Sequence, residues 1–561
     1  MSDGRLNPHS RAAAIQRLRS GSVDVLVVGG GITGSGIALD AAARGLQVGL
    51  IERTDIAAGT SSRSSKLIHG GLRYLEMLDF GLVREALTER RLLLTRIAPH
   101  LVRPVPFLFP LHRRMVERVY MGAGLLLYDS MGGARHLPRT RHLSRRATLA
   151  AAPTLRPDGV VGAVHFYDGQ EDDALYAVYA ARTAAAQGAV IATGVEAVEL
   201  LRDESGRVAG VEVVDHESGD RFPVRAASTI AAVGPATDWL LGAAGVAGEP
   251  VLRPSKGVHA LIPRDRIPMR SGLFMRTEKS IFHAIPWGPD HWLLGDTDTE
   301  WDPSLGDTPL ANREDVAYLL AKVNSALLRP VLPRDVLGVF AGLRPLVTAP
   351  GAADTTRLSR AHRIFQPLPG LTAIAGGKYT TYRVMARDAV DAALHELGGG
   401  YPASTTARVP LVGAEGAGPA PVEGLGAVRL GRLVARHGAC ACEVLGLAAG
   451  DSQLLAPIPG AEAYLLAEAV HACTHQGARS LEDVLARRLR ASIETADRGR
   501  SAARAVAPLV GSALGWSDER TADELAAYVR LRDAEQAAER AATDAEAVAA
   551  YRAVMAGTAV S

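Results

Sequence analysis

A glycine-rich turn between two apolar runs constrains the fold of this chain more than any other feature. Residues 23–28 (VDVLVV) have the length and β-branched composition of a strand that is buried on both faces. Three glycines follow in the order G-x-G-x-x-G: Gly29, Gly31 and Gly34. Residues 32–44 are typical of an alanine-rich helix, and residues 47–51 predict a second buried strand, which ends at Glu52. This unit predicts a doubly wound α/β domain that binds a dinucleotide.

Each part of the unit has a physical role in dinucleotide binding. Gly29 permits the tight turn, Gly31 lets backbone amides approach a pyrophosphate, and Gly34 lets the helix pack closely on the strand. The first turn of the helix offers unpaired N–H groups and a partial positive charge to that pyrophosphate. Glu52 can accept hydrogen bonds from an adenosine ribose. NAD and FAD share the same ADP half, so the unit does not distinguish them, and a purely structural turn is the alternative.

A hydroxyl-rich loop after the second strand is a second candidate for the binding site. It contains five hydroxyl side chains: Thr60, Ser61, Ser62, Ser64 and Ser65. Four further polar side chains follow around a glycine pair: Lys66, His69, Arg73 and Tyr74. A solvated loop is one interpretation, because such loops are common. A ligand site beside the nucleotide fold is the other, and the crowding of cations around the glycines favours it.

The composition bounds the class of protein. A chain of 561 residues is too long for one hydrophobic core, so two or three domains are expected. An apolar content of 47% and a net charge of +2 are those of a soluble globular protein, without a case for nucleic-acid binding. Residues 1–20 lack the apolar core of a secretory signal, and no uncharged run is long enough to span a membrane. We therefore expect a cytosolic protein, or one that lies on a membrane without crossing it.

A basic stretch between residues 113 and 146 allows two interpretations. Three arginines precede an apolar run at 119–128, and residues 135–146 hold five arginines and two histidines. A solvated charged face is the ordinary interpretation. A basic, partly apolar patch that binds anionic lipid headgroups is the more specific functional interpretation. Aromatic side chains do not interleave with the arginines of 135–146, so nucleic acid is not expected there either.

The chain downstream predicts how the remaining elements are organised. Residues 190–230 contain alternating runs separated by turn signals, which predict an antiparallel meander that leads into a buried strand of the nucleotide sheet. Residues 250–335 contain short strands and a helix at 312–327, and suit a domain that covers the substrate. Residues 370–382 repeat the order of strand, glycine pair and helix, which would close the cofactor domain. From residue 430 onwards the chain is expected to be helical throughout.

Six blocks within residues 23–390 resemble the FAD-dependent glycerol-3-phosphate dehydrogenases of the glycine-oxidase-like flavoprotein superfamily. The blocks are 64–76 (SSKLIHGGLRYLE), 255–259 (SKGVH), 285–287 (IPW), 295–298 (GDTD), 342–346 (GLRPL) and 376–383 (GGKYTTYR). The resemblance implies an α/β fold, with a Rossmann-like FAD-binding domain, an inserted antiparallel-sheet substrate domain and a C-terminal all-α domain. It also implies FAD as cofactor, and a cytoplasmic enzyme bound peripherally to the inner face of the cell membrane.

The expected domain boundaries follow this architecture. The FAD-binding domain is expected in three parts: residues 21–100, 151–249 and 336–397. Residues 101–150 are expected to face the substrate or the membrane, residues 250–335 to bind the substrate, and residues 405–561 to form the helical domain. The resemblance implies that FAD is held by the following residues: Gly29, Gly31, Gly34, Glu52, Arg53, Thr60, Ser61, Ser62, Ser65, Lys66, Leu67, His69, Gly70, Gly234, Gly377, Lys378, Tyr379 and Thr380.

Oxidation of a secondary alcohol beside a phosphate requires a base for the hydroxyl proton, a flavin N5 for the hydride and cations for the phosphate. His259 is the expected base, because imidazole titrates near neutral pH. Arg344 is assigned to the C2 oxygen of the substrate, where it would stabilise developing alkoxide charge. The phosphate is assigned to Arg73 and Lys378, with Tyr74 as a hydroxyl donor, and Lys378 joins His259 and Arg344 in the catalytic set. A core histidine and a surface ion pair are the structural alternatives for His259 and Arg344.

The expected reaction converts sn-glycerol 3-phosphate to dihydroxyacetone phosphate and reduces a membrane quinone. A glycerol-3-phosphate oxidase on the same scaffold would instead give hydrogen peroxide. A nicotinamide-linked dehydrogenase and a non-catalytic flavin-binding module are more distant alternatives. A homodimer is compatible with the sequence.

Cysteine and histidine spacing gives no prediction of a metal centre. The chain has three cysteines, Cys440, Cys442 and Cys473, which exclude a disulfide framework and indicate a reducing cytosol. Together with His471 and His475 they match no standard zinc spacing, and their helical context favours packing.

Overall fold

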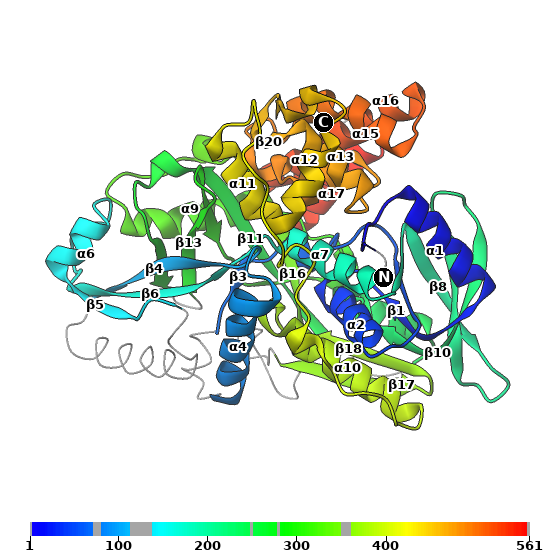
Figure 1. Cartoon of the computed structure of the whole chain (residues 1–561). Coiled ribbons are helices and arrows are strands. Elements are labelled where there is room, and N and C mark those ends of the chain that lie inside the picture. Colours follow the sequence, from blue (N-terminus) through cyan, green and yellow to red (C-terminus); the bar gives the residue numbers. More distant parts are fainter. Residues whose placement is uncertain are drawn as a thin grey trace.

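Two β-sheets and a group of C-terminal helices make up the fold of the computed structural model (Figure 1). The structure describes residues 3–70, 80–112, 137–246, 251–277, 281–348 and 361–557. In Figure 1 the sheets lie to the two sides of the molecule, and the C-terminal helices lie above the junction between them. None of the described helices combines the length and the apolar character that a membrane span needs.

The first sheet carries the nucleotide unit. Its main strands follow the order β17-β18-β10-β1-β2-β7, and all are parallel to their neighbours except β17. Their bounds are β1 Ser22–Val28, β2 Val48–Glu52, β7 Val190–Thr193, β10 Arg221–Ala231, β17 His362–Leu368 and β18 Leu371–Gly376. The predicted meander is present, since β8 (Val195–Arg202) pairs with β9 (Val208–Asp215) and β9 pairs with β10. The predicted doubly wound α/β fold is therefore confirmed.

Burial on both faces explains why residues 25–28 of β1 are all apolar. Val25 and Val27 belong to the core beneath three helices: α2 (Ile32–Ala43), α7 (Asp173–Ala186) and α10 (Tyr382–Glu396). Leu26 and Val28 point to the opposite face, where α1 (Pro8–Ser20) and the meander bury them. Burying both faces stabilises the sheet by about 1.5–3 kcal/mol for each large apolar side chain.

The second sheet is antiparallel except where β4 pairs with β12. Its order is β15-β11-β14-β13-β12-β4-β6-β3, with β16 beside β11 and β5 beside β6. The bounds are β3 Leu67–Ile68, β4 Arg103–Leu111, β5 Arg141–Ser144, β6 Gly162–Gln170, β11 Leu252–Pro263, β12 Gly272–Arg276, β13 Ile281–Trp287, β14 His291–Gly295, β15 Thr299–Glu300 and β16 Gly338–Val347. Helix α9 (Arg313–Ala326) covers one face, and α4 (Phe80–Leu92) packs on the other. The sheet thus takes β4, β6 and β16 from outside residues 250–335.

The C-terminal region is helical, with one exception to the prediction. Its helices are α11 Ala427–His437, α12 Ala441–Leu447, α13 Leu466–Thr474, α14 Ala491–Glu494, α15 Arg500–Leu514, α16 Asp518–Arg540 and α17 Asp544–Met555. A short hairpin of β19 (Pro457–Ile458) and β20 (Ala461–Leu465) interrupts them. Gly460 turns the hairpin with a φ of +80°, a conformation that suits glycine and ends a helix. Two shorter helices lie earlier in the chain, α6 Arg145–Ala151 and α8 Thr237–Ala243.

Candidate active site

A cavity of about 720 Å³ opens where the parallel strands of the first sheet end. Residues that follow four of these strands line it: Gly29 after β1, Glu52 at the end of β2, Gly234 after β10 and Gly377 after β18. Carboxyl ends of parallel strands are the usual binding edge of a doubly wound sheet. The size of the cavity is in the range of small-molecule and cofactor sites.

The glycine turn at this edge leaves no space for side chains. Gly29 has a φ of +108°, and a Cβ at Gly34 would lie 1.8 Å from the carbonyl oxygen of Gly29. At Gly31 a Cβ would be 3.1 Å from the Oγ of Ser61. That Oγ accepts a hydrogen bond from the Ile32 amide at 2.9 Å, in the first turn of α2. The backbone is therefore open to the cavity at the helix N-terminus, which is a suitable place for an anion.

Glu52 is fixed beside this turn. Its Oε2 accepts a hydrogen bond from the Gly30 amide at 2.7 Å, and its Oε1 accepts one from the Thr54 amide at 2.9 Å. A carboxylate has further lone pairs, so both oxygens can still accept bonds from ribose hydroxyls.

The predicted cofactor residues divide into two groups. Those that line the cavity are Gly29, Gly31, Glu52, Arg53, Thr60, Ser61, Ser62, Gly234, Gly377, Lys378 and Tyr379. The lining among the described residues does not include Gly34, Ser65, Lys66, Leu67, His69, Gly70 and Thr380. Gly34 packs under the turn, Leu67 is in β3, and the His69 amide donates to Thr380 Oγ1 at 3.1 Å.

Lys66 lies in a buried ion pair. Its Nζ donates to Asp173 Oδ1 at 2.7 Å, and both side chains are fully buried. Asp173 Oδ2 also accepts hydrogen bonds from the amide and the hydroxyl of Ser64, at 2.9 and 2.7 Å. Burial lowers the pKa of Lys66, and Arg490 lowers it further, whereas Asp173 raises it. The ammonium group therefore fixes the hydroxyl-rich loop to Asp173.

His259 is held on the second sheet by a serine and an aromatic ring. Its Nε2 is 2.9 Å from Ser65 Oγ, and its ring stacks on Phe340 with centroids 5.0 Å apart. Burial lowers the pKa of His259 well below its usual value, so the imidazole is neutral at neutral pH. A Cβ at Gly295 would be 2.2 Å from His259 Cδ2. This position must be glycine for the ring to lie where it does.

Arg344 lies on the same face of the same sheet. In the register of β11 and β16, His259 is opposite Phe340 and Ser255 is opposite Arg344, so all four side chains share one face. The guanidinium donates to the carboxylate of Asp296 and, at 2.9 Å, to the carbonyl oxygen of Thr297. A Cβ at Gly257 would be 2.4 Å from an Arg344 nitrogen, so a second glycine makes room for the guanidinium.

The predicted phosphate group is described only in part. Lys378 lines the cavity, at the turn between β18 and α10, whereas Arg73 and Tyr74 lie outside the described residues. Phe340, Leu343 and Pro345 line the cavity on either side of the positions taken by His259 and Arg344. The structure thus brings His259 and Arg344 close to each other and places Lys378 on the cavity wall, whereas His259 and Arg344 are themselves not among the lining residues.

Three residues near this centre were not predicted from sequence. His283 is buried with its ring 5.9 Å from that of His259, and Asp296 is the acidic partner of Arg344. The block GDTD contains Asp296, and His283 lies two residues before the block IPW. The resemblance in these two blocks could therefore have pointed to both residues. Arg490 bonds to Asp173 across more than 300 residues, and local sequence carries no signal for such a pair.

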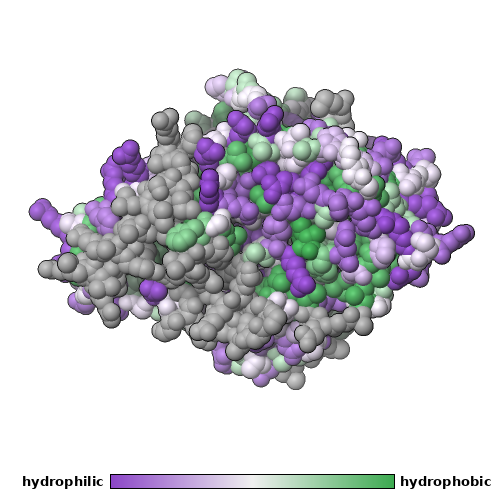
Figure 2. All heavy atoms as spheres, turned by 90° about the horizontal axis from the view of Figure 1, so that it is seen from below, coloured by the Kyte–Doolittle hydropathy of each residue, from purple (hydrophilic) through white to green (hydrophobic). Residues whose placement is uncertain are grey.

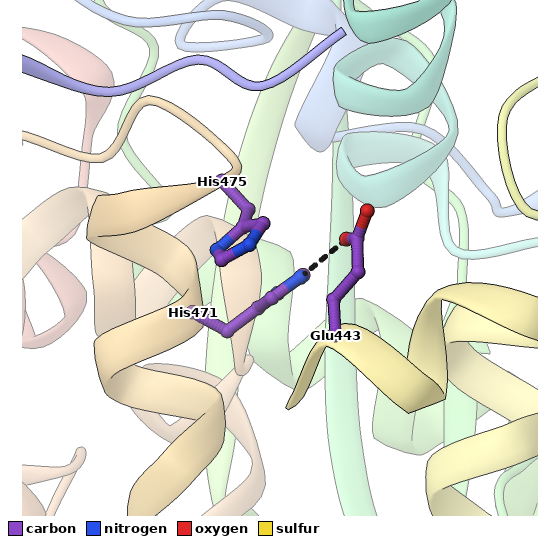
Figure 3. Close-up of side chains that lie close together, drawn as sticks. All are labelled: Glu443, His471 and His475. Atoms are coloured by element: carbon purple, nitrogen blue, oxygen red, sulfur yellow. Dashed lines mark hydrogen bonds and ion pairs between the residues drawn. The ribbon is translucent and has the colours of Figure 1, made fainter. Parts of the chain in front are cut away.

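Glu443, His471 and His475 form a separate cluster whose donor atoms all lie within 4.8 Å of one another (Figure 3). The two histidines are four residues apart at the end of α13, a spacing that can hold a metal. However, Arg182 of α7 donates to both carboxylate oxygens of Glu443, at 3.0 and 2.9 Å, and His471 Nε2 is 2.9 Å from Oε2. A divalent cation would lie next to the guanidinium, so we interpret the cluster as an ion-paired contact between α7 and the C-terminal helices.

Comparisons with known proteins match both parts of the chain. Residues 24–383 match the family model of FAD dependent oxidoreductases, and residues 404–521 match that of the C-terminal domain of alpha-glycerophosphate oxidase. Glycerol-3-phosphate dehydrogenase 2 of Mycobacterium tuberculosis is 47% identical over 538 residues, which cover 94% of this chain and 91% of the relative. The mitochondrial glycerol-3-phosphate dehydrogenase of Mus musculus is 36% identical, over 93% and 75% of the two chains. The crystal structure of glycerol-3-phosphate dehydrogenase from Bacillus halodurans complexed with FAD matches with a TM-score of 0.74 and 28% identity, over 93% and 96%.

Proposed function

The chain belongs to the glycerol-3-phosphate dehydrogenase family of FAD-dependent oxidoreductases, and we propose that it oxidises sn-glycerol 3-phosphate to dihydroxyacetone phosphate and passes the electrons to a membrane quinone. The observation that carries this proposal is the 47% identity over 94% of the chain. The neutral His259 and the cationic Arg344 on one face beside the cavity support it independently.

The cofactor of this chain is FAD, and the cavity fits it. When bound, FAD supplies the acceptor for the hydride that leaves C2 of the substrate. Backbone amides at Gly31 and the N-terminus of α2 would hold the pyrophosphate, and Glu52 would hold the ribose. The cradle has no room for a Cβ at Gly29, where it would lie 2.6 Å from the Ala232 carbonyl oxygen. This close approach of the Ala232 backbone, together with a φ of +108°, is the reason for glycine at this turn.

His259 and Arg344 have complementary tasks in the proposed reaction. The imidazole of His259 is neutral and is held by Ser65, so it can accept the hydroxyl proton. The guanidinium of Arg344 would stabilise the negative charge that develops on the C2 oxygen. Asp296 holds the guanidinium in place, so little reorganisation is needed during the reaction.

The phosphate is proposed to bind Lys378, together with Arg73 and Tyr74. Lys378 lines the cavity and offers a point charge to a phosphate dianion. Unphosphorylated glycerol lacks this interaction, and we expect it to be a poor substrate.

The proposed quinone acceptor places the enzyme on the inner face of the cell membrane. The described part of the basic stretch supports lipid binding, because Arg139, Arg141 and Arg146 are exposed. Figure 2, a view from below, shows polar and apolar residues intermixed over the described part of the face that it draws. A homodimer is part of the proposal as well, and sedimentation velocity would test it.

Reoxidation of the reduced enzyme tests the acceptor. Flavin reduced anaerobically with one equivalent of glycerol 3-phosphate should regain its absorbance within seconds of adding a short-chain quinone. Air without quinone should restore it much more slowly. Faster return in air than with quinone would identify an oxidase and contradict the proposed acceptor.

A further inference from the structure

A run of arginines in the C-terminal region contacts the segment between β2 and the hydroxyl-rich loop. Arg487 and Arg488 donate to the buried carboxylate of Asp55 at 2.6 Å each, and Arg488 donates to its second oxygen at 2.8 Å. Burial would raise the pKa of Asp55, but the two guanidinium groups hold it below its usual value. Arg487 and Arg490 also line the cavity. This segment of the C-terminal region is therefore part of the cavity wall.

Arg490 makes the contacts nearest to the reacting groups. It donates to Asp172 Oδ1 from two nitrogens, at 3.1 and 2.7 Å, and to Asp173 Oδ1. A third nitrogen donates to the carbonyl oxygen of Ser62 at 3.2 Å. The residue is buried and has a φ of +68°, directly before α14, which packs on β16. One side chain thus joins the C-terminal region to α7 and to the hydroxyl-rich loop.

Asp173 transmits this contact along the loop. The carboxylate that accepts from Arg490 also accepts from Lys66 Nζ and from the amide and hydroxyl of Ser64. Ser65 lies between these two residues, and its Oγ is 2.9 Å from His259 Nε2. A continuous path of hydrogen bonds and ion pairs therefore runs from Arg490 through Asp173 and the loop to the imidazole.

Arg490 belongs to a buried group of ion pairs, in which Arg436 also lies 3.9 Å from Asp172. Two cations, Lys66 and Arg490, face two carboxylates, Asp172 and Asp173, in a buried setting. Removing Arg490 would leave a buried negative charge without its partner, and the ion-pair geometry would change to compensate. Because Arg490 lowers the pKa of Lys66, its loss would also raise that pKa.

We propose that Arg490 is a positioning residue for the reaction: through Asp173 it fixes residues 62–66, and Ser65 then holds the His259 ring in place. The C-terminal region thereby takes part in proton removal without touching the substrate. This inference rests on the proposed function, since His259 must be the base.

Substitution of Arg490 tests the inference, and substitution of Arg182 in its ion pair with Glu443 is the matched control. Arg182 is also fully buried, also contacts a carboxylate with two nitrogens, and also joins α7 to the C-terminal helices, but it does not line the cavity (Figure 3 shows its partner Glu443). We compare Arg490→Met, Arg490→Lys and Arg182→Met as holoenzymes. Each is mixed anaerobically with glycerol 3-phosphate, and the rate constant of flavin bleaching is recorded against pH and substrate concentration.

Arg490→Met should lower the limiting rate about tenfold or more, with the apparent Kd for glycerol 3-phosphate changed less than twofold. Its pH midpoint should shift, because the contact between Ser65 and the imidazole is loosened. The other charged groups around His259 are Asp296, His283, Arg344 and Lys66, and none of them is substituted in this variant. Arg490→Lys should restore part of the rate, and Arg182→Met should keep the wild-type rate and pH profile.

A double-mutant cycle keeps the test decisive if Arg490→Met does not retain FAD. Arg490→Lys and Ser65→Ala should be strongly non-additive, because both act on His259 through the same loop. Additive effects, or a wild-type rate and pH profile in Arg490→Met, would overturn the inference. If the wild-type flavin is not bleached, the proposed function fails, and the pH titration of the His259 imidazole by NMR then decides the inference: an unchanged midpoint in Arg490→Lys contradicts it.

Discussion

The Oγ of Ser65 lies 2.9 Å from Nε2 of His259, and this contact joins the loop of the first sheet to the proposed base on the second. The two residues are 194 positions apart in the chain. The proposed reaction depends on this contact, because the glycine turn lies on the first sheet and the base on the second, and both sheets line the cavity.

Ser65→Ala should slow flavin reduction by about fivefold, since one lost hydrogen bond to the base is worth about 1 kcal/mol. Stopped-flow bleaching with glycerol 3-phosphate measures this rate. Ser20→Ala removes an exposed hydroxyl at the end of α1 and should leave the rate unchanged. An unaltered rate in Ser65→Ala would show that the contact does not orient His259.

Gly295→Ala should displace the His259 ring, because the new Cβ would lie 2.2 Å from its Cδ2. We expect flavin reduction to fall by about a hundredfold, the effect of misplacing a reacting group by about 1 Å. Overpacking should also lower the free energy of unfolding by about 1–3 kcal/mol. Gly446→Ala in α12, where a Cβ meets no atom within 4 Å, is the control and should keep full activity.

The protein should lose stability in mild acid through His471 and His475. Burial lowers the pKa of His471 to about 3 and that of His475 to about 4, so both rings stay neutral in the folded protein at pH 5. The unfolded chain binds a proton on each below pH 6.5, so the free energy of unfolding falls by about 2 kcal/mol per histidine at pH 5. Urea titrations at pH 7.5 and 5 measure the loss. His471→Gln should show a smaller loss, and an equal loss would contradict this account.

Reversal of three exposed arginines should weaken binding to anionic liposomes. Arg139→Glu, Arg141→Glu and Arg146→Glu together remove contacts worth about 1 kcal/mol each near a charged membrane. A control with the same change of charge alters Arg429, Arg520 and Arg530, which are exposed in the C-terminal region. Co-sedimentation at low salt compares the two variants, and equal binding would show that residues 137–146 do not face the membrane.

Local chemistry made the nucleotide unit predictable from sequence. The strand at 23–28, the helix after Gly31 and the return strand at 228–231 were predicted, because apolar periodicity and glycine turns act over short distances. The pairing of Asp173 with Lys66 and Arg490 was not, since partners that meet only after folding leave no local pattern. For the same reason Lys66 was assigned to the cofactor, although its ammonium group pairs with Asp173 in the structure. The four prolines within residues 99–110 predict an extended segment, but sequence does not show that residues 103–111 form β4 of the second sheet.

Anaerobic addition of glycerol 3-phosphate to the oxidised holoenzyme is the most direct test of the central claim. The flavin absorbance should bleach within seconds, with one equivalent of dihydroxyacetone phosphate formed, and unphosphorylated glycerol at the same concentration should leave the colour unchanged. Bleaching by glycerol alone would contradict the proposed phosphate contacts, and no bleaching by glycerol 3-phosphate would contradict the proposed substrate.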